Sequence, residues 1–203
     1  MHPIFRQTKV IPVVTIERES DAVPLARALA RGGLKLIEVT LRTPAALAAI
    51  AAIAHDVPEV VVGAGTILRD SDVTRALAAG AHFLVSPGLT AELAAAGLAA
   101  DVPFIPGAIT PSEVIMARDL GFSFLKFYPA AGAGGVATLR NYALVFAGTV
   151  FCPTGGVTGE NAPDYLALPN VPLVGGAWMA PPEAILAGDW SGITERARRA
   201  GAG

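Results

Sequence analysis

The chain has 203 residues, of which 53% are hydrophobic and 16% charged, so it can bury a sizeable core and is not a disordered chain. Lysines and arginines total 15 against 17 acidic residues, a balance that argues against a broad surface for nucleic acid. The single cysteine, Cys152, cannot form an internal disulfide and has no zinc-ligand spacing with any of the three histidines. We therefore expect a cytoplasmic protein without a metal, a transmembrane helix or a secretory signal.

Eight short apolar or β-branched runs recur along the chain at intervals of about 20 to 26 residues. Segments rich in alanine and leucine separate these runs, and each is long enough for a helix. This alternation is typical of βαβ units, in which parallel strands are buried beneath helices. The predicted strands begin near Val10, Leu36, Val60, Phe83, Pro103, Phe124, Val150 and Val171.

Local chemistry predicts several helix boundaries. Thr43 followed by Pro44 indicates an N-cap with proline at the first helical position. Thr110 and Glu113 have the spacing of a capping box, in which each side chain bonds the backbone N–H of the other residue. Five glycines should end helices, because glycine adopts the left-handed conformation of a C-terminal cap without steric strain. They are Gly32, Gly80, Gly97, Gly121 and Gly188.

The even spacing of eight strand–helix units favours a closed (β/α)8 TIM barrel over an open sheet. We predict that residues 1–203 form one such α/β domain, with the residues before Val10 as a short plug or helix over the barrel floor. The alternative is an open doubly wound sheet. Its usual dinucleotide-binding signature is missing, because Gly63 and Gly65 follow a strand without the third glycine at the required spacing.

Polar and apolar side chains alternate along the second predicted strand, residues 36–42. Glu38, Thr40 and Arg42 share one face, which should point inward because the apolar face packs beneath helices. One interpretation is a structural pair between Glu38 and Arg42 in the barrel interior. The other is a general base beside an anion-binding arginine, at the end of the barrel where active sites gather.

Lys126 stands among bulky apolar residues in the sixth predicted strand and is one of only three lysines in the chain. Burial favours the neutral amine, which is the form that attacks a carbonyl carbon. Lys126 is therefore a candidate Schiff-base nucleophile, with Phe124 and Tyr128 on the same face to exclude water. The alternative is a lysine at a strand end whose amine reaches solvent.

Glycine pairs follow the seventh and eighth predicted strands, at 155–156 and 175–176. Glycine N–H groups can approach an anion closely, and barrels commonly bind phosphate in the loops after these two strands. A single glycine pair is more often a tight turn, but two pairs on consecutive loops favour a phosphate site. Small residues also end the third and fourth strands, in segments 63–66 and 86–88, which leaves room for a substrate.

Five motifs, in order on five predicted strands, resemble 2-keto-3-deoxy-6-phosphogluconate (KDPG) aldolase over nearly the whole chain. They are Glu-Val-Thr-Leu-Arg-Thr at 38–43, Gly-Ala-Gly-Thr at 63–66, Ser-Pro-Gly at 86–88, Phe-Leu-Lys-Phe-Tyr-Pro at 124–129 and Cys-Pro-Thr-Gly-Gly at 152–156. The resemblance implies a class I aldolase, a lyase of the Entner–Doudoroff pathway, that forms a homotrimer of barrels and needs no cofactor or metal.

The resemblance also implies a role for each residue that matches the family's pyruvate site. Lys126 would form the Schiff base, and Glu38 would shuttle protons. Arg42 and Thr66 would bind the pyruvate carboxylate, and Pro87 would line that pocket. The keto acid end of a substrate is therefore expected between these side chains.

The other end of the substrate would meet the glycine loops. By resemblance, Thr154 contacts the aldehyde portion of the substrate. The implied phosphate pocket contains Gly155, Gly156 and Gly176. Ala177 departs from the family, which commonly has serine there, so a hydroxyl expected to bond the phosphate is missing. Backbone donors remain at Ala177 and the glycines, and we expect weaker phosphate recognition.

The predicted reaction is cleavage of KDPG to pyruvate and glyceraldehyde 3-phosphate. Close alternatives are cleavage of 4-hydroxy-2-oxoglutarate or of the galactonate epimer by the same lysine chemistry, because the stereochemical preference at C4 is not evident from the sequence. A barrel sugar-phosphate isomerase would share the glycine loops but would not need the lysine. A non-catalytic phosphate-binding module would bind its ligand without turnover.

Overall fold

The computed structural model of the protein describes residues 1–201. Its strands begin within about three residues of the eight predicted positions, so the predicted alternation of strands and helices is confirmed. The strands are β1 (Val10–Val14), β2 (Leu36–Thr40), β3 (Val61–Gly65), β4 (Leu84–Val85), β5 (Phe104–Ile105), β6 (Phe124–Phe127), β7 (Val150–Pro153) and β8 (Val174–Gly176).

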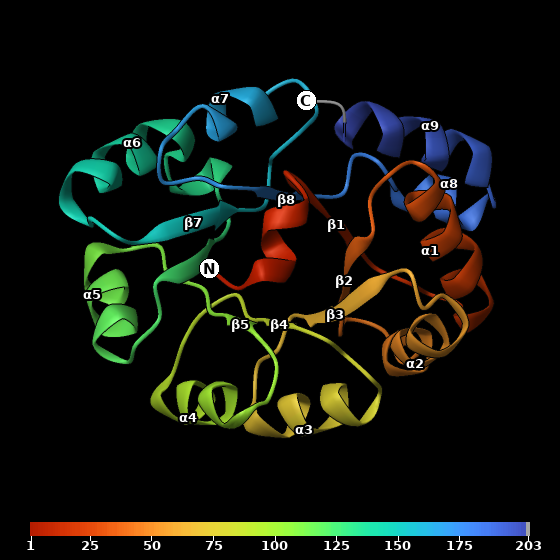
Figure 1. Ribbon diagram of the computed structural model, residues 1–203, viewed down its shortest axis with the longest axis horizontal. Coiled ribbons are helices and arrows are strands. Elements are labelled where there is room, and N and C mark those ends of the chain that lie inside the picture. The colour runs from red at the N-terminus through yellow and green to blue at the C-terminus, as the bar shows by residue number, and fades with distance from the viewer. Residues whose placement is uncertain (202–203) are drawn as a thin grey trace.

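The strands pair in parallel and form two hydrogen-bonded sheets. Six strands make one sheet in the order β5-β4-β3-β2-β1-β8, and β6 pairs with β7 in the other. Isolated parallel bridges link the two sheets, from Gly107 to Lys126 and from Thr154 to Gly175. The strands surround a common centre, and helices lie outside them (Figure 1). The fold is therefore of the α/β class, with a curled parallel sheet whose regular ladders are interrupted at β5–β6 and β7–β8.

Helices follow the strands along the chain, and α9 returns to pack against α1. No helix within residues 1–201 is long and apolar enough to cross a membrane. The α-helices are α1 (Ala22–Arg31), α2 (Ala46–Asp56), α3 (Asp70–Ala78), α4 (Ala91–Ala99), α5 (Pro111–Asp119), α6 (Gly135–Val145), α7 (Ala162–Leu166), α8 (Pro182–Leu186) and α9 (Trp190–Gly201). Short 3-10 helices are η1 (Pro3–Gln7), η2 (Glu19–Asp21) and η3 (Ala131–Ala133).

The predicted plug before Val10 is confirmed as the 3-10 helix η1, which lies at the centre of the ring of strands (Figure 1). Phe5 is 1% exposed, and its ring meets those of Phe83 and Phe124 at centroid distances of 5.4 Å. These partners lie at the amino ends of β4 and β6. An interior core, separate from the larger one between strands and helices, thus fills the floor of the curled sheet.

Several predicted helix ends are confirmed. Thr110 and Glu113 form the capping box of α5, in which the glutamate carboxylate accepts the Thr110 N–H at 2.8 Å. Left-handed glycines follow α3, α5 and α8 as predicted, at Gly80, Gly121 and Gly188.

Gly32 is the C-cap of α1, as predicted, but it keeps a right-handed conformation, and the left-handed residue is Gly33. Two other boundary predictions are wrong. Thr43 is not the N-cap of α2, because its hydroxyl donates to the Ile16 carbonyl at 2.6 Å and the helix begins further on. Gly97 lies inside α4, where a Cβ would approach the Phe104 ring to 2.0 Å. This glycine therefore serves close packing of α4 on the sheet, not helix termination.

Candidate active site

The centre of the candidate site is a buried contact between Lys126 of β6 and Glu38 of β2. The lysine Nζ donates to Glu38 Oε1 at 2.9 Å, and the two residues are 5% and 3% exposed. Two expectations are thereby decided. Lys126 is buried rather than exposed at a strand end, and the carboxylate of Glu38 pairs with this lysine rather than with Arg42.

Glu38 has room for its carboxylate because a neighbouring strand carries no side chain beside it. In the register of β2 and β3, Thr40 lies beside Gly65. A Cβ on Gly65 would lie 2.0 Å from Glu38 Oε1. The glycine at this position therefore lets the Glu38 side chain extend toward Lys126, which explains why small residues end the third strand.

The contact between amine and carboxylate gives Lys126 a direct route to its reactive form. A charged amine cannot attack a carbonyl, whereas the neutral amine can. At 2.9 Å, a proton can pass from Nζ to Oε1 without an intervening water. The ring of Tyr128 also lies beside the amine, with its centroid 5.5 Å from Nζ. Lys126 is therefore buried, with a carboxylate in direct contact that could accept its proton.

The second buried group near the amine is the thiol of Cys152, which lies beside Lys126 in the register of β6 and β7. Burial raises the pKa of the Cys152 thiol to about 12, although the positive charge of Lys126 opposes the shift. The thiol is therefore protonated at neutral pH. It lies beside the lysine and competes with it neither as a nucleophile nor as a base.

Arg42 lies further out than the strand pattern predicted. β2 ends at Thr40, so Arg42 belongs to the following turn, and its side chain is exposed. Its Nε donates to Thr66 Oγ1 at 3.2 Å. Thr66 follows β3 and has a φ of 61°, a left-handed conformation that is rare for a threonine. The structure thus brings Arg42 and Thr66 together at the carboxyl ends of β2 and β3.

A cavity of about 380 Å³ opens above Lys126 at the carboxyl ends of the strands. Of the predicted site residues, it is lined by Lys126, Arg42, Thr154, Gly155, Gly156, Gly176 and Ala177. Glu38, Thr66 and Pro87 are absent from its lining within residues 1–201. Glu38 lies beneath Lys126, whereas Thr66 reaches the cavity only through Arg42.

Pro87 lies in the loop after β4, where the chain passes unusually close to the next loop. A Cβ on Gly107 would lie 2.1 Å from the Pro87 carbonyl oxygen. Ser86, which precedes the proline, is completely buried, and its hydroxyl donates to the Gly88 carbonyl at 2.6 Å. The structure therefore holds Pro87 in a rigid turn on the β4 side of the site.

Residues that the sequence reasoning missed also line the cavity. Thr15 follows β1, and Trp178 follows β8, with its ring close enough to Gly176 that a Cβ there would lie 2.0 Å from Cζ3. Neither residue type indicates a particular chemistry at these positions. The sequence signals were the place of both residues one or two positions after a predicted strand and, for Trp178, its position next to Ala177 in the segment compared with the family.

The far end of the cavity is built from main chain. Gly155 and Gly156 have φ angles of 90° and 77°, which a residue with a Cβ rarely adopts. Within residues 1–201, the N–H groups of Gly156 and Ala177 donate to no other group of the protein. These N–H groups on two consecutive loops are thus free to donate to an anion in the cavity.

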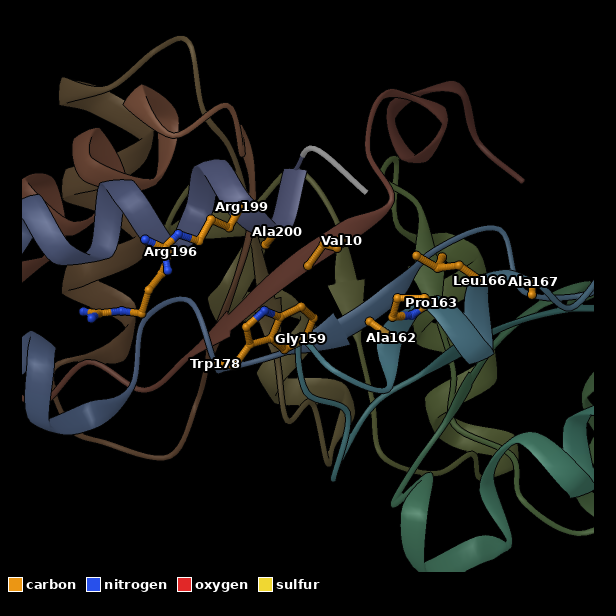
Figure 2. Close-up of a pocket in the computed structure, with 10 residues that line it drawn as sticks. All are labelled: Val10, Gly159, Ala162, Pro163, Leu166, Ala167, Trp178, Arg196, Arg199 and Ala200. Atoms are coloured by element: carbon orange, nitrogen blue, oxygen red, sulfur yellow. The ribbon is translucent and has the colours of Figure 1, made fainter.

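A larger hollow of about 640 Å³ lies outside the ring of strands, between α7 and α9 (Figure 2). Its wall is mostly apolar, with Leu166 from α7 on one side and two arginines of α9 on the other. Arg196 is paired with Asp189 at 3.1 Å, and Arg199 with Glu195 at 3.1 Å. The lining includes neither a lysine nor a carboxylate, so the smaller cavity at Lys126 is the candidate active site.

A buried lysine amine in contact with a carboxylate, at the carboxyl ends of parallel strands, defines a class of enzymes that act on carbonyl compounds through a lysine nucleophile. The chain belongs to the KDPG and KHG aldolase family, whose family model matches residues 1–196. KHG denotes 2-keto-4-hydroxyglutarate, which is the same compound as 4-hydroxy-2-oxoglutarate. The resemblance found in the sequence motifs is confirmed. No group of three or more histidine, cysteine, aspartate or glutamate side chains that could hold a metal ion occurs among the described residues.

Relatives with known names match nearly the whole chain. The 2-dehydro-3-deoxy-phosphogluconate aldolase of Pseudoalteromonas atlantica is 46% identical over 200 residues, which cover 98% of this chain and 93% of the relative. The KHG/KDPG aldolase of Escherichia coli strain K12 is 46% identical over 94% of this chain and 90% of the relative. A crystal structure of the KDPG aldolase of Legionella pneumophila, with pyruvate captured as a covalent carbinolamine, has a TM-score of 0.95 and 43% identity, covering 98% of this chain and 96% of that one.

Proposed function

We propose that this protein is a class I aldolase that cleaves KDPG to pyruvate and glyceraldehyde 3-phosphate. The observation that carries the proposal is the buried contact of 2.9 Å between Lys126 Nζ and Glu38 Oε1 beside a cavity with free main-chain donors. Membership of the KDPG and KHG aldolase family supports the same reaction. So does the covalent pyruvate carbinolamine of the Legionella pneumophila relative, because it is the intermediate that an attacking amine forms with a ketone.

The reaction begins when Lys126 gives a proton to Glu38 and its neutral amine attacks the C2 ketone of the substrate. The carbinolamine that forms loses its hydroxyl group as water, for which Glu38 supplies the proton, and an iminium ion remains. The iminium accepts electrons that a ketone would accept less readily. Glu38 is again a carboxylate at this stage, in position to take a second proton.

Cleavage uses this second proton transfer. Glu38, directly or through a water, removes the proton of the C4 hydroxyl, and the electron pair of the C3–C4 bond moves into the iminium. Glyceraldehyde 3-phosphate leaves, and an enamine of pyruvate stays bound to Lys126. Glu38 returns its proton to C3, and hydrolysis of the resulting iminium releases pyruvate and restores the amine.

The remaining site residues would hold the two ends of the substrate. We assign the carboxylate of the keto acid to Arg42, since its guanidinium is exposed at the cavity and can form a charge-assisted bidentate contact. Thr66 would orient that guanidinium and reach the same carboxylate, with Pro87 closing this side. Thr154 would contact the aldehyde portion of the substrate.

Phosphate would bind at the opposite end, to the main-chain N–H groups of the loops after β7 and β8. Gly155, Gly156, Gly176 and Ala177 all line the cavity, which supports this assignment. The side chain of Ala177 adds no hydroxyl. Phosphate would therefore depend on main-chain donors and would be held less tightly than with a serine at this position.

Reduction with borohydride in the presence of pyruvate tests the lysine chemistry, because hydride traps an iminium as a stable amine. We expect a reduced three-carbon adduct on Lys126 and none in Lys126→Arg, whose guanidinium stays protonated. An adduct on Lys9 or Lys35 instead would overturn the assignment. A protein with no adduct that interconverts sugar phosphates would instead be a barrel isomerase.

The substrate is tested by coupled measurement of pyruvate release. We expect KDPG to be cleaved with a higher kcat/KM than 4-hydroxy-2-oxoglutarate, the galactonate epimer or the unphosphorylated analogue of KDPG. A second candidate function is cleavage of 4-hydroxy-2-oxoglutarate, which the name of the Escherichia coli relative and the missing hydroxyl at Ala177 both favour. A higher kcat/KM for that compound would replace the first proposal with the second.

The same proposal extends to the whole molecule. We propose that the described residues 1–201 form a single closed (β/α)8 barrel, which the two isolated bridges between the sheets support; the last two residues of the predicted domain, 202–203, lie outside the described residues. We also propose a homotrimer. Exposed apolar side chains on the neighbouring helices α5 and α6, which include Ile115, Met116, Leu144 and Val145, support burial against another copy. Light scattering should give the mass of three chains, and a monomer at micromolar concentration would contradict it.

The free, buried thiol of Cys152 suits the reducing cytoplasm, where fractionation should find the protein.

A further inference from the structure

Thr15 lies where the middle of a bound substrate must pass. It directly follows β1 and lines the cavity together with Lys126 and Arg42. In the sheet, β1 stands between β2, which leads into Arg42, and β8, which leads into Ala177. A molecule that extends from the arginine to the glycine loops therefore crosses the end of β1.

The hydroxyl of Thr15 belongs to a pair. Val13 lies beside Glu38 in the register of β1 and β2, and Thr15 and Thr40 are each two residues further along, toward the cavity. Their Oγ1 atoms are 2.9 Å apart. Thr40 is only 1% exposed, whereas Thr15 is partly exposed. Thr15 is therefore the member of the pair that a substrate can reach more readily.

The number of hydroxyl protons determines whether Thr15 can donate or accept a hydrogen bond in the cavity. Each hydroxyl has one proton, and a carbonyl oxygen can only accept. Thr40 Oγ1 lies 3.2 Å from the carbonyl oxygen of Val14 and donates to it. Both hydrogen bonds of Thr40 form together only if Thr15 gives its own proton to Thr40. Thr15 Oγ1 then presents lone pairs alone to the cavity.

We propose that Thr15 accepts a hydrogen bond from the C5 hydroxyl of the substrate, and so selects aldehyde halves that carry a hydroxyl next to the aldehyde carbon. This inference rests on the proposed function and deepens it. Lone pairs attract an O–H donor and repel carboxylate or phosphate oxygens, so neither charged end of the substrate fits at Thr15. Glu38 takes the proton of the C4 hydroxyl, which leaves the C5 hydroxyl as the donor in the middle of the molecule.

The condensation direction tests this selection, because the hydroxyl at C2 of the aldehyde becomes the hydroxyl at C5 of the product. Pyruvate is condensed with D-glyceraldehyde 3-phosphate and with its 2-deoxy analogue, 3-hydroxypropanal phosphate. The measured quantity is the ratio of kcat/KM for the two aldehydes. Thr15→Val, which keeps the shape and removes the hydroxyl, should lower this ratio about tenfold. Thr15→Ser, which restores an acceptor, should keep the ratio within about twofold of the wild-type value.

An unchanged ratio in Thr15→Val would overturn the inference, even if both rates fell, since a purely structural role weakens both condensations alike. If Thr15→Val did not fold, Thr15→Ala would give the same comparison. Borohydride trapping of pyruvate by the wild type, measured in parallel, distinguishes a failure of the Thr15 proposal from a failure of the proposed aldolase function. Trapping on Lys126 with an unchanged ratio contradicts only the role of Thr15, whereas no trapping on Lys126 contradicts the aldolase itself.

Discussion

At the scale of single residues, the proton transfer assigned to Glu38 can be tested separately from substrate binding. Glu38→Gln keeps an oxygen that can accept from Lys126, but an amide cannot take up a proton. We expect kcat to fall by about 10² to 10⁴, the usual value of general acid–base assistance, with a much smaller change in KM because Arg42 still holds the carboxylate. Steady-state kinetics and exchange of the pyruvate methyl protons with deuterated water measure both steps. Near-normal rates in both would show that the pair with Lys126 is only structural.

Ala177 offers a test in the opposite direction, a gain of function. Ala177→Ser adds a hydroxyl at the exposed loop after β8, where main-chain donors already line the cavity. A hydrogen bond to a charged group is worth roughly 1.5 to 3 kcal/mol, but a bound water can already supply part of it. We therefore expect a gain in kcat/KM of about tenfold or less with KDPG, and none with its unphosphorylated analogue. Equal gains with both compounds would show that this loop does not bind the phosphate.

The residues of the site differ in how clearly the surrounding sequence indicates their role. Lys126 and Glu38 were predictable, because a charged side chain within a buried apolar strand needs a functional or ionic partner. Arg42 was assigned to the strand because the alternation was extended two residues past its actual end at Thr40. Thr15 was missed, since threonine is common in strands and only its contact with Thr40 and the cavity distinguishes it.

At the scale of elements, the start of α5 carries a local capping box. Thr110 accepts the Glu113 N–H, and the hydrogen bond from the Thr110 N–H is the main cause that lowers the pKa of Glu113. Thr110→Ala removes one half of this box and should lower the free energy of unfolding by about 1 kcal/mol, or the Tm by roughly 2 to 4 °C. Urea denaturation of the two proteins measures it. Arg6→Ala, at an exposed position in η1 rather than in α5, is the control and should stay within about 0.5 kcal/mol of the wild type.

The contrast with Thr43 and Gly97 explains why other boundaries could not be predicted. Both have the residue type of a helix end, yet each is used in a contact with a distant segment, Thr43 with the carbonyl of Ile16 and Gly97 with the ring of Phe104. Strand starts were predictable because apolar runs are set by burial, a property of the whole sheet. A helix cap depends on which group a single side chain contacts. That group can come from a distant segment, so the local sequence does not identify it.

At the scale of the whole molecule, the two ends of the ring of strands have different tasks. The carboxyl end holds the lysine, the arginine and the free main-chain donors, whereas the amino end is filled by η1 and its interior core. A substitution at the floor should therefore change stability and leave the chemistry alone. Phe5 is suited to test this division, because it is 1% exposed and contacts aromatic rings from two different strands.

Phe5→Ala should lower the free energy of unfolding by about 3 to 5 kcal/mol, the usual effect of truncating a buried phenylalanine, because it leaves a cavity between Phe83 and Phe124. Chemical denaturation measures this loss. Gln7→Ala, on the same short helix but exposed, should change the free energy of unfolding by less than about 0.5 kcal/mol. Borohydride trapping of pyruvate, measured well below the unfolding temperature, should proceed in Phe5→Ala at the wild-type rate. A variant that kept its stability would show that η1 merely rests on the floor, and a slowed trapping reaction would show that the floor and Lys126 are mechanically coupled.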